Sequence, residues 1–176
     1  MFLHKDKSNI GASSPEEFGN YYAWGEIETK DKYSMSNSAT FELTMDELQA
    51  QGYINEEGNL SSSYDVATVN WGGRWRMPTG AEIRELMDNC TWIWTTLKGV
   101  KGYNIEGSNG SSIFIPAAGY CAGGNVLFEG EFCNYWSYTP VVDSKHQSYA
   151  LDYGEGFKEI SEFVRYAGLS VRPVTE

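Results

Sequence analysis

The sequence predicts an α+β domain in which helices of the N-terminal half pack on a twisted antiparallel sheet with long loops. Three helix-capping motifs lie within the first 90 residues, and strand-like alternation begins after Cys90. Glycine reaches 19 residues and aromatic side chains make up 15%, a composition that favours strands and loops over a helical bundle. The length of 176 residues suits one unit, so we expect a single domain over 1–176.

The first two helices are predicted from capping boxes, in which Ser or Thr precedes Glu by three residues. "SSPEEF" predicts a short helix near 15–19 with Ser14 as its cap and proline in its first position. "TMDELQAQG" predicts a second short helix that is capped by Thr44 and ended by Gly52 in a left-handed conformation.

The third helix follows "NWGGRWRMPT" and is predicted over 80–89, with Thr79 as its cap. Its apolar side chains recur at i, i+3, i+4 and i+7, which gives one buried stripe: Ile83, Leu86, Met87 and Cys90. The two tryptophans and two arginines ahead of the helix resemble site chemistry, but their position indicates scaffold. We therefore expect Trp75 to be buried.

Strands are predicted from "TWIWTTL" onward. The pair "GYNIE" and "SSIFIP" flanks Asn109-Gly110, a strong hairpin signal. Further strands are expected at "NYWSYT", "QSYALDY" and "GLSVRPV", with only strands and loops up to the C-terminus. In "SYALDY", alternation separates Ala150 and Asp152 on one face from Tyr149, Leu151 and Tyr153 on the other.

The charge balance restricts the partners. The chain has 24 acidic and 13 basic residues and a formal net charge of −11, so the field of a nucleic acid or an anionic membrane would repel it. No apolar run approaches the length of a membrane span, and "MFLHKDKSNIG" has no stretch suited to a signal peptide. We expect no nucleic-acid partner and no membrane insertion.

Catalytic and metal chemistry find little support. Cys90, Cys121 and Cys133 show no CxxC spacing, and His4 and His146 are the only histidines. The acidic segment "GEIETKDK" matches no helix–loop–helix calcium loop. We therefore predict no catalytic residue, no metal ligand and no cofactor.

Aromatic residues in the C-terminal half exceed what one core face of a few short strands can bury. Alternation points about half of them outward, where Tyr and Trp suit recognition. The alternative is that they pack beneath surface loops. The residues are Tyr135, Trp136, Tyr138, Tyr149, Tyr153, Phe157, Phe163 and Tyr166.

"RMPTGAEIREL" resembles the "R-L-P-T-E-A-E-W-E" hallmark of the formylglycine-generating-enzyme branch of the C-type lectin-like fold. Five segments occur in the same order as in a large lectin-fold family of gut bacteria and their phages, known as the major paralogous domain: "NIGASSPEEFGNYYAWGE", "NWGGRWRMPT", "IFIPAAGY", "YWSYT" and "YAGLSVRPV". The resemblance covers nearly the whole chain and implies this fold. It also implies an apolar first strand before "NIGA", where this sequence has "MFLHKDKS".

Enzymes of this branch use paired cysteines with copper or an iron site built from histidines. Lectins of the wider fold bind sugars through "EPN" or "QPD" with "WND". This sequence has neither the metal-site patterns of these enzymes nor the sugar-binding motifs of these lectins. The resemblance in fold therefore implies neither catalysis nor calcium-dependent sugar binding.

A third use of the fold is display. Variable proteins of diversity-generating retroelements carry substitutions at selected codons of their C-terminal region, and this chain has residue types that adenine mutagenesis permits at such positions. The resemblance implies a ligand-binding surface that contains Cys121, Phe132, Cys133, Asn134, Tyr138, Val141, Val142, His146, Ala150, Asp152, Val164 and Ala167. The alternative is ordinary drift in a paralogue that is not diversified.

These expectations combine into one hypothesis and two alternatives. The hypothesis is a non-enzymatic binding protein for an unknown protein or glycan on a cell surface, located on a cell or a phage particle. One alternative is a metal-dependent oxidase or sulfatase-activating-type enzyme of the same fold. The other is a surface adhesin module without a variable site.

Overall fold

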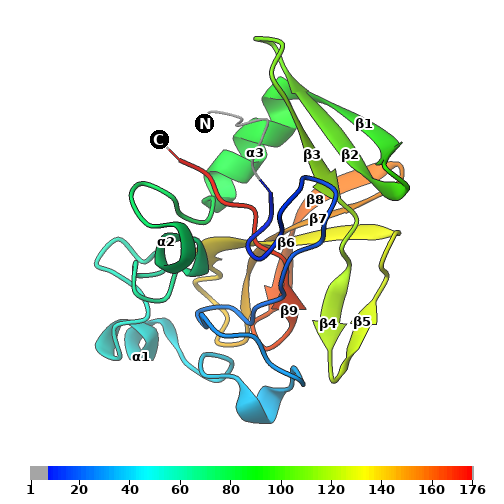
Figure 1. The fold of residues 1–176 in the computed structure, drawn as a ribbon. Coiled ribbons are helices and arrows are strands. Elements are labelled where there is room, and N and C mark those ends of the chain that lie inside the picture. The colour runs from blue at the N-terminus through cyan, green and yellow to red at the C-terminus, as the bar shows by residue number, and fades with distance from the viewer. Residues whose placement is uncertain (1–7, 176) are drawn as a thin grey trace.

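The computed structural model describes residues 8–175 and has mixed helix and sheet. The helical elements lie in the N-terminal half (Figure 1): a 3-10 turn at Met35–Asn37, α1 at Met45–Ala50, α2 at Val66–Trp71 and α3 at Gly80–Asn89. The strands follow: β1 Cys90–Leu97, β2 Val100–Gly107, β3 Ser112–Pro116, β4 Tyr120–Ala122, β5 Asn125–Leu127, β6 Phe132–Pro140, β7 Gln147–Gly154, β8 Phe157–Val164 and β9 Gly168–Leu169. No helix among these residues is long and apolar enough to cross a membrane.

The strands form antiparallel sheets with the orders β1-β2-β3, β5-β4-β9 and β6-β7-β8. Parallel bridges from Gly119 to Cys133 and from Tyr135 to Ser170 join β6 to the segments beside β4 and β9. Strand β6 therefore lies at the centre of the molecule, with α3 and the β1–β3 sheet on one side (Figure 1).

Capping chemistry explains the helices that were predicted correctly. Helix α1 begins at the Thr44 capping box, and Gly52 follows it with φ 78°. Helix α3 spans 80–89 as predicted, with the Thr79 hydroxyl accepting from Glu82 N–H. The helix expected at 15–19 is wrong: Glu17 turns back to accept from Ser13 N–H at 2.7 Å, and the segment forms only a turn.

Helix α2 was not predicted, although Asp65 caps it by accepting from the N–H groups of Ala67 and Thr68. The other Asp65 oxygen accepts from Met77 N–H at 2.9 Å. One buried carboxylate thus fixes both α2 and the segment that leads into α3. Strand β8 was also missed, and the "GLSVRPV" strand is shorter than expected, at Gly168–Leu169. The apolar first strand that the resemblance implies lies outside the described residues.

The stretch before α3 is scaffold, as predicted, but not through a buried Trp75. Arg76 forms a bidentate pair with Glu82, with N–O distances of 2.7 and 2.8 Å, and exchanges backbone hydrogen bonds with Val174. The expectation that Trp75 is buried is wrong: its ring is half-buried, in edge contact with Trp71 at 5.0 Å. Met77 takes the core position instead, at 2% exposure.

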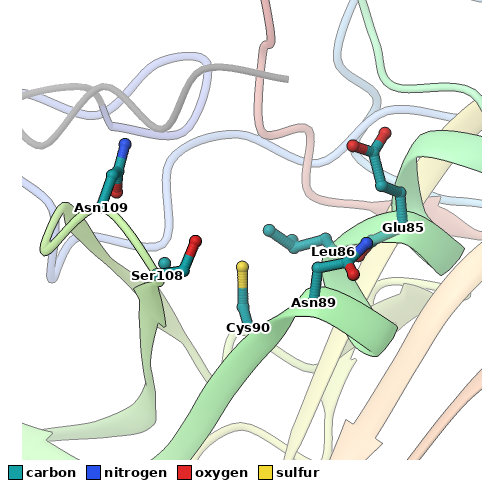
Figure 2. A pocket seen from close by; sticks show the side chains of 7 residues that line it. Glu85, Leu86, Asn89, Cys90, Ser108 and Asn109 are labelled. Carbon is teal, nitrogen blue, oxygen red and sulfur yellow. The ribbon is translucent and has the colours of Figure 1, made fainter.

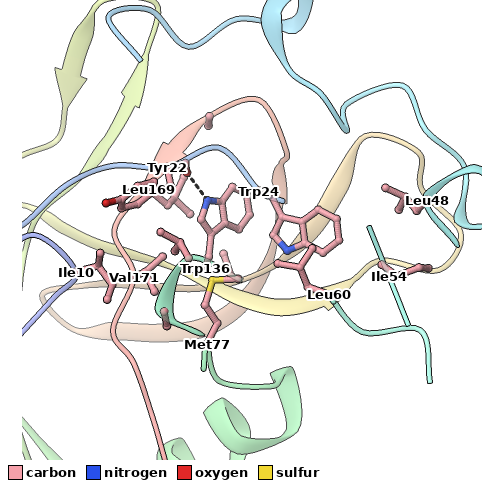
Figure 3. Packing of buried hydrophobic residues seen from close by; sticks show 14 residues of the cluster. Ile10, Tyr22, Trp24, Leu48, Ile54, Leu60, Met77, Trp136, Leu169 and Val171 are labelled. Atoms are coloured by element: carbon pink, nitrogen blue, oxygen red, sulfur yellow. Dashed lines mark hydrogen bonds between the residues drawn. The ribbon is translucent and has the colours of Figure 1, made fainter. Parts of the chain in front are cut away.

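The core has two main parts, one on each side of β6. Figure 3 shows the first, where the Trp136 indole donates to Tyr22 C=O at 2.7 Å and lies beside Trp24 and Met77. The second contains α3, β2 and β3 residues with Tyr135 and Tyr153. Strand β6 is consequently buried on both faces from Cys133 to Ser137.

Candidate functional site

A chain of five aromatic rings on the surface marks the candidate site. It begins at Phe157 in β8, passes to Phe132 in β6 and Phe128 after β5, continues to Tyr120 in β4 and returns to β8 at Phe163. Successive centroid distances are 5.6, 5.2, 6.0 and 4.9 Å. Phe128 is 47% exposed and Phe157 39% exposed. These five rings are called the aromatic face below.

The backbone holds Phe128 in an unusual conformation. Its φ is 58°, a left-handed region that bulky side chains rarely adopt. Its carbonyl accepts from the N–H groups of Glu131 and Phe132, and Gly119 passes so close that a Cβ there would lie 2.0 Å from Leu127 O. The surrounding contacts therefore hold Phe128 in a strained backbone conformation. Residues strained in this way are frequent at ligand sites.

Polar residues lie between the two ends of the ring chain. Because directly paired residues of antiparallel strands share a face, Asn134, Asp152 and Glu159 form one row across β6, β7 and β8. The row lies beside that of Phe132, Gly154 and Phe157. Asn134 Nδ2 donates to Asp152 Oδ1 at 2.9 Å. This row is called the acidic row.

Burial and like charge shape the acidic row. Burial, followed by the nearby Glu159 carboxylate, raises the pKa of Asp152, and the Asn134 hydrogen bond opposes the rise. Asn134 is 2% exposed, and its Oδ1 has no hydrogen-bond partner among residues 8–175. Ser161 Oγ, one row further along, is also buried without such a partner. The site therefore has unused hydrogen-bonding capacity.

A hollow of about 250 Å³ adjoins the Phe163 end of the aromatic face. Tyr120 and Phe163 belong to both, and Val164 and Ala167 line the hollow as well. Two residues expected at a ligand site therefore lie beside the aromatic face.

The structure brings four of the predicted site residues together on this face of the sheet: Phe132, Asn134, Ala150 and Asp152. Alternation in β7 is confirmed, since Ala150 packs in one core cluster and Leu151 in the other. Several predicted site residues are not exposed, because other segments pack over them. These buried positions are Cys121, Cys133, Asn134, Val141, Ala150 and Ala167.

The remaining predicted residues lie elsewhere. Tyr138 contacts Arg76, whose guanidinium carbon lies 5.6 Å from the ring centroid. Val142 is 69% exposed in the β6–β7 loop, and His146 of the same loop lies 3.3 Å from the Glu42 carboxylate. The buried Arg165 joins this loop to the segment before α1. Its guanidinium donates to five backbone carbonyl oxygens at distances of 2.9–3.4 Å: those of Thr40, Leu43, Ser144, Lys145 and Gln147.

The three thiols lie in different parts of the fold, and burial disfavours the ionisation of each. Figure 2 shows Cys90 in a pocket of about 180 Å³ between the end of α3 and the turn that contains Ser108 and Asn109. Burial raises the pKa of Cys90, and it raises the pKa of Cys121 to about 11. Cys133 donates to Ile115 C=O in the core. All three are free, and the described residues contain no group of three or more His, Cys, Asp or Glu placed to hold a metal ion.

Sequence reasoning missed three contributors to the site: Tyr120, Phe128 and Glu159. Phe157 and Phe163 are among the aromatic residues considered for recognition, but because β8 is not predicted, the sequence does not assign them to a face of the sheet. The turn "GEG" between two alternating segments was the available signal for β8. Phe128 and Phe132 are only four residues apart, but no residue pattern predicts the left-handed turn at Phe128 that brings their rings together.

Comparison of the chain with protein-family models, with curated proteins and with solved structures gives no match. The assignment of function therefore depends on the geometry above and on the resemblance of the motifs.

Proposed function

We propose that this protein is a non-enzymatic binding protein of C-type lectin-like fold that recognises a ligand on a cell surface through its aromatic face. The observation that carries the proposal is the chain of five contacting rings around a polar row. Partly exposed aromatic rings provide large, rigid contact areas at a small cost in side-chain entropy. A contiguous exposed apolar patch with polar residues beside it is typical of an interaction site.

The motif resemblance supports the same proposal from the scaffold side. Four of its five segments contribute to the core around Trp136: Tyr22 and Trp24, Met77, Trp136 itself, and Leu169 with Val171. The fifth contributes Ile115 and Ala117 to the second core cluster. The matching motifs therefore coincide with the packed scaffold, while the aromatic face lies mainly on residues between them.

The experiment that tests the proposal compares two ring deletions with a matched control. Phe157→Ala removes one exposed ring, and Phe128→Gly removes another while suiting the left-handed backbone. Val69→Ser removes an exposed apolar side chain of α2, which contributes no residue to the aromatic face or to the predicted ligand-binding surface. Each labelled protein is applied to arrays of bacterial cells, proteins and glycans.

We expect the wild type and Val69→Ser to bind the same targets, and both ring variants to lose them. Target binding that survives both ring deletions would contradict the proposal. Binding of a catalytic substrate with turnover would instead favour the oxidase alternative.

Diversification by a retroelement is a separate part of the proposal, and genomic sequence decides it. We expect a reverse transcriptase gene nearby and a near-copy of the codons for residues 120–170 that differs only at adenines. An ordinary gene neighbourhood would favour the adhesin module without a variable site.

A further inference from the structure

The acidic row offers hydrogen-bond acceptors in excess of donors. Because the Asp152 carboxylate only accepts, the Asn134 amide is oriented with Nδ2 toward Asp152 and Oδ1 turned away. That Oδ1 is buried and has no donor within the described part of the chain. Asp152 and Glu159 supply further acceptor oxygens in the same row. A ligand that completes this row must be rich in donors.

The charge of the surroundings is strongly negative. Asp152 and Glu159 occupy directly opposite positions on β7 and β8, where two like charges repel. The lysine beside them does not compensate, since Lys158 Nζ donates to Met87 C=O at 2.9 Å and lies over Trp92. The chain as a whole is acidic as well, with a formal net charge of −11.

The neighbouring rings suit a cation as well. Phe132 and Phe157 form the adjacent row, and Phe128 contacts Phe132 at a centroid distance of 5.2 Å. Phenylalanine rings offer a negative face without a hydroxyl, and a guanidinium or ammonium group stacks favourably on such a face. Arginine and lysine side chains carry only donors, which matches the acceptors of the row. A sugar hydroxyl both donates and accepts, so it would use this row less completely.

We propose that the aromatic face binds a cationic side chain, arginine or lysine, which a protein partner inserts between the Phe132–Phe157 row and the acidic row. The inference depends on the proposed binding function and specifies its ligand chemistry. The carboxylates of Asp152 and Glu159 bind the cation, and the phenylalanine rings cover its apolar stem. Asn134 Oδ1, which is buried in the free protein, accepts one of its N–H groups after the side chains that cover it move aside.

The test uses N-acetyl-arginine amide as the probe and N-acetyl-citrulline amide as its neutral isostere. Each is titrated into the isotopically labelled full chain while NMR follows the Asn134 side-chain amide and the Phe157 backbone amide. We expect saturable shifts at both positions with the arginine compound. Losing the charge-assisted hydrogen bonds should weaken the citrulline compound by about tenfold or more. Equal affinity for the two compounds would overturn the proposal.

Two variants and one control locate the effect. Asp152→Asn keeps an acceptor for the Asn134 amide while removing the charge, and Glu159→Gln removes the charge at an exposed position. Asp143→Asn removes one charge from the β6–β7 loop, outside the aromatic face. We expect the first two to weaken binding of the arginine probe about tenfold and the third to leave it unchanged. An equal loss of affinity in all three variants would show that the probe responds only to the net charge of the protein, and it would overturn the proposed site.

The failure of this inference is distinguishable from the failure of the proposed function. If the ring variants lose their array targets but the arginine probe does not shift Asn134, the ligand chemistry is wrong and the binding function stands. If methyl glucoside shifts the same two amides and the arginine probe does not, the site is one for carbohydrate. If the arginine probe binds but the ring variants keep every target, the assigned function is wrong.

Discussion

The two faces of the β6-β7-β8 sheet differ in what covers them. The inner face packs Tyr135, Leu151 and Tyr153 against α3 and the β1–β3 sheet, and the Tyr135 hydroxyl donates to Pro116 C=O at 2.8 Å. The outer face is closed at one end, where Trp136 and Ala150 join the first core cluster, and open at the other, at Phe132 and Phe157.

The difference shows that alternation along a strand assigns a residue to a face, but that neighbouring segments decide its exposure. On β7, Ala150 and Asp152 share the outer face, yet Ala150 is fully buried and Asp152 is half-buried. On this one face, a residue's position along the strand therefore decides whether it belongs to the packed core or to the candidate site.

The largest effect is expected at the closed end of the outer face. Trp136→Ala removes a fully buried indole and its hydrogen bond to Tyr22 C=O, so the free energy of unfolding should fall by about 3–5 kcal/mol. Urea unfolding of the two proteins measures this loss. Trp75→Ala is the control: its half-buried ring should account for about 1–2 kcal/mol. If Trp75→Ala lost as much as Trp136→Ala, the scaffold role would have been assigned to the wrong tryptophan.

A smaller effect is expected at the open end. Phe157→Ala removes an exposed ring that contacts Phe132 at a centroid distance of 5.6 Å and lies over Gly154, so the free energy of unfolding should fall by about 1 kcal/mol. The same urea titration provides the measurement. A loss as large as that of Trp136→Ala would show that the open end is also core and would remove the distinction between the two ends.

The parts of the fold that the sequence predicts are those with local chemistry. The capping boxes at Thr44 and Thr79, the Asn109-Gly110 turn and the alternation of β1 and β7 all depend on nearby residues. The false helix at 15–19 has the same capping signal, but it has no apolar stripe to stabilise it by packing.

The candidate site depends on contacts between distant segments, which is why the sequence predicts only part of it. The Asn134–Asp152 pair follows from the register of β6 on β7, and Phe128 reaches Phe132 through a left-handed turn that Gly119 accommodates. Buried positions such as Cys133 and Val141 were predicted at the site because residue type alone does not reveal which layer covers them.

The pH dependence of stability tests the half-buried acidic row. Because the pKa of Asp152 is raised in the folded chain, the folded state binds the proton more tightly and ionisation favours the unfolded chain. This carboxyl therefore supports folding most below its unfolded pKa, and that support is lost as pH rises through the folded pKa. Asp152→Asn does not titrate, so its Tm relative to wild type should increase across this interval and then level off. A difference independent of pH would contradict the assigned burial and charge repulsion.

Thiol labelling probes how completely the inner face is sealed, with no change in stability required. Cys133 is fully buried on the inner face, and burial raises its pKa well above the usual range, so neither access nor ionisation favours reaction. Cys121 is buried under the same constraint, whereas Cys90 is half-buried at the pocket beside α3. Ellman's reagent should therefore modify Cys90 in the native protein, more slowly than a free thiol because burial raises its pKa as well, and all three cysteines in urea. Rapid native labelling of Cys133, located by mass spectrometry, would mean that the inner face opens as readily as the outer one, and the contrast between the two faces would then lie in their residues alone and not in their packing.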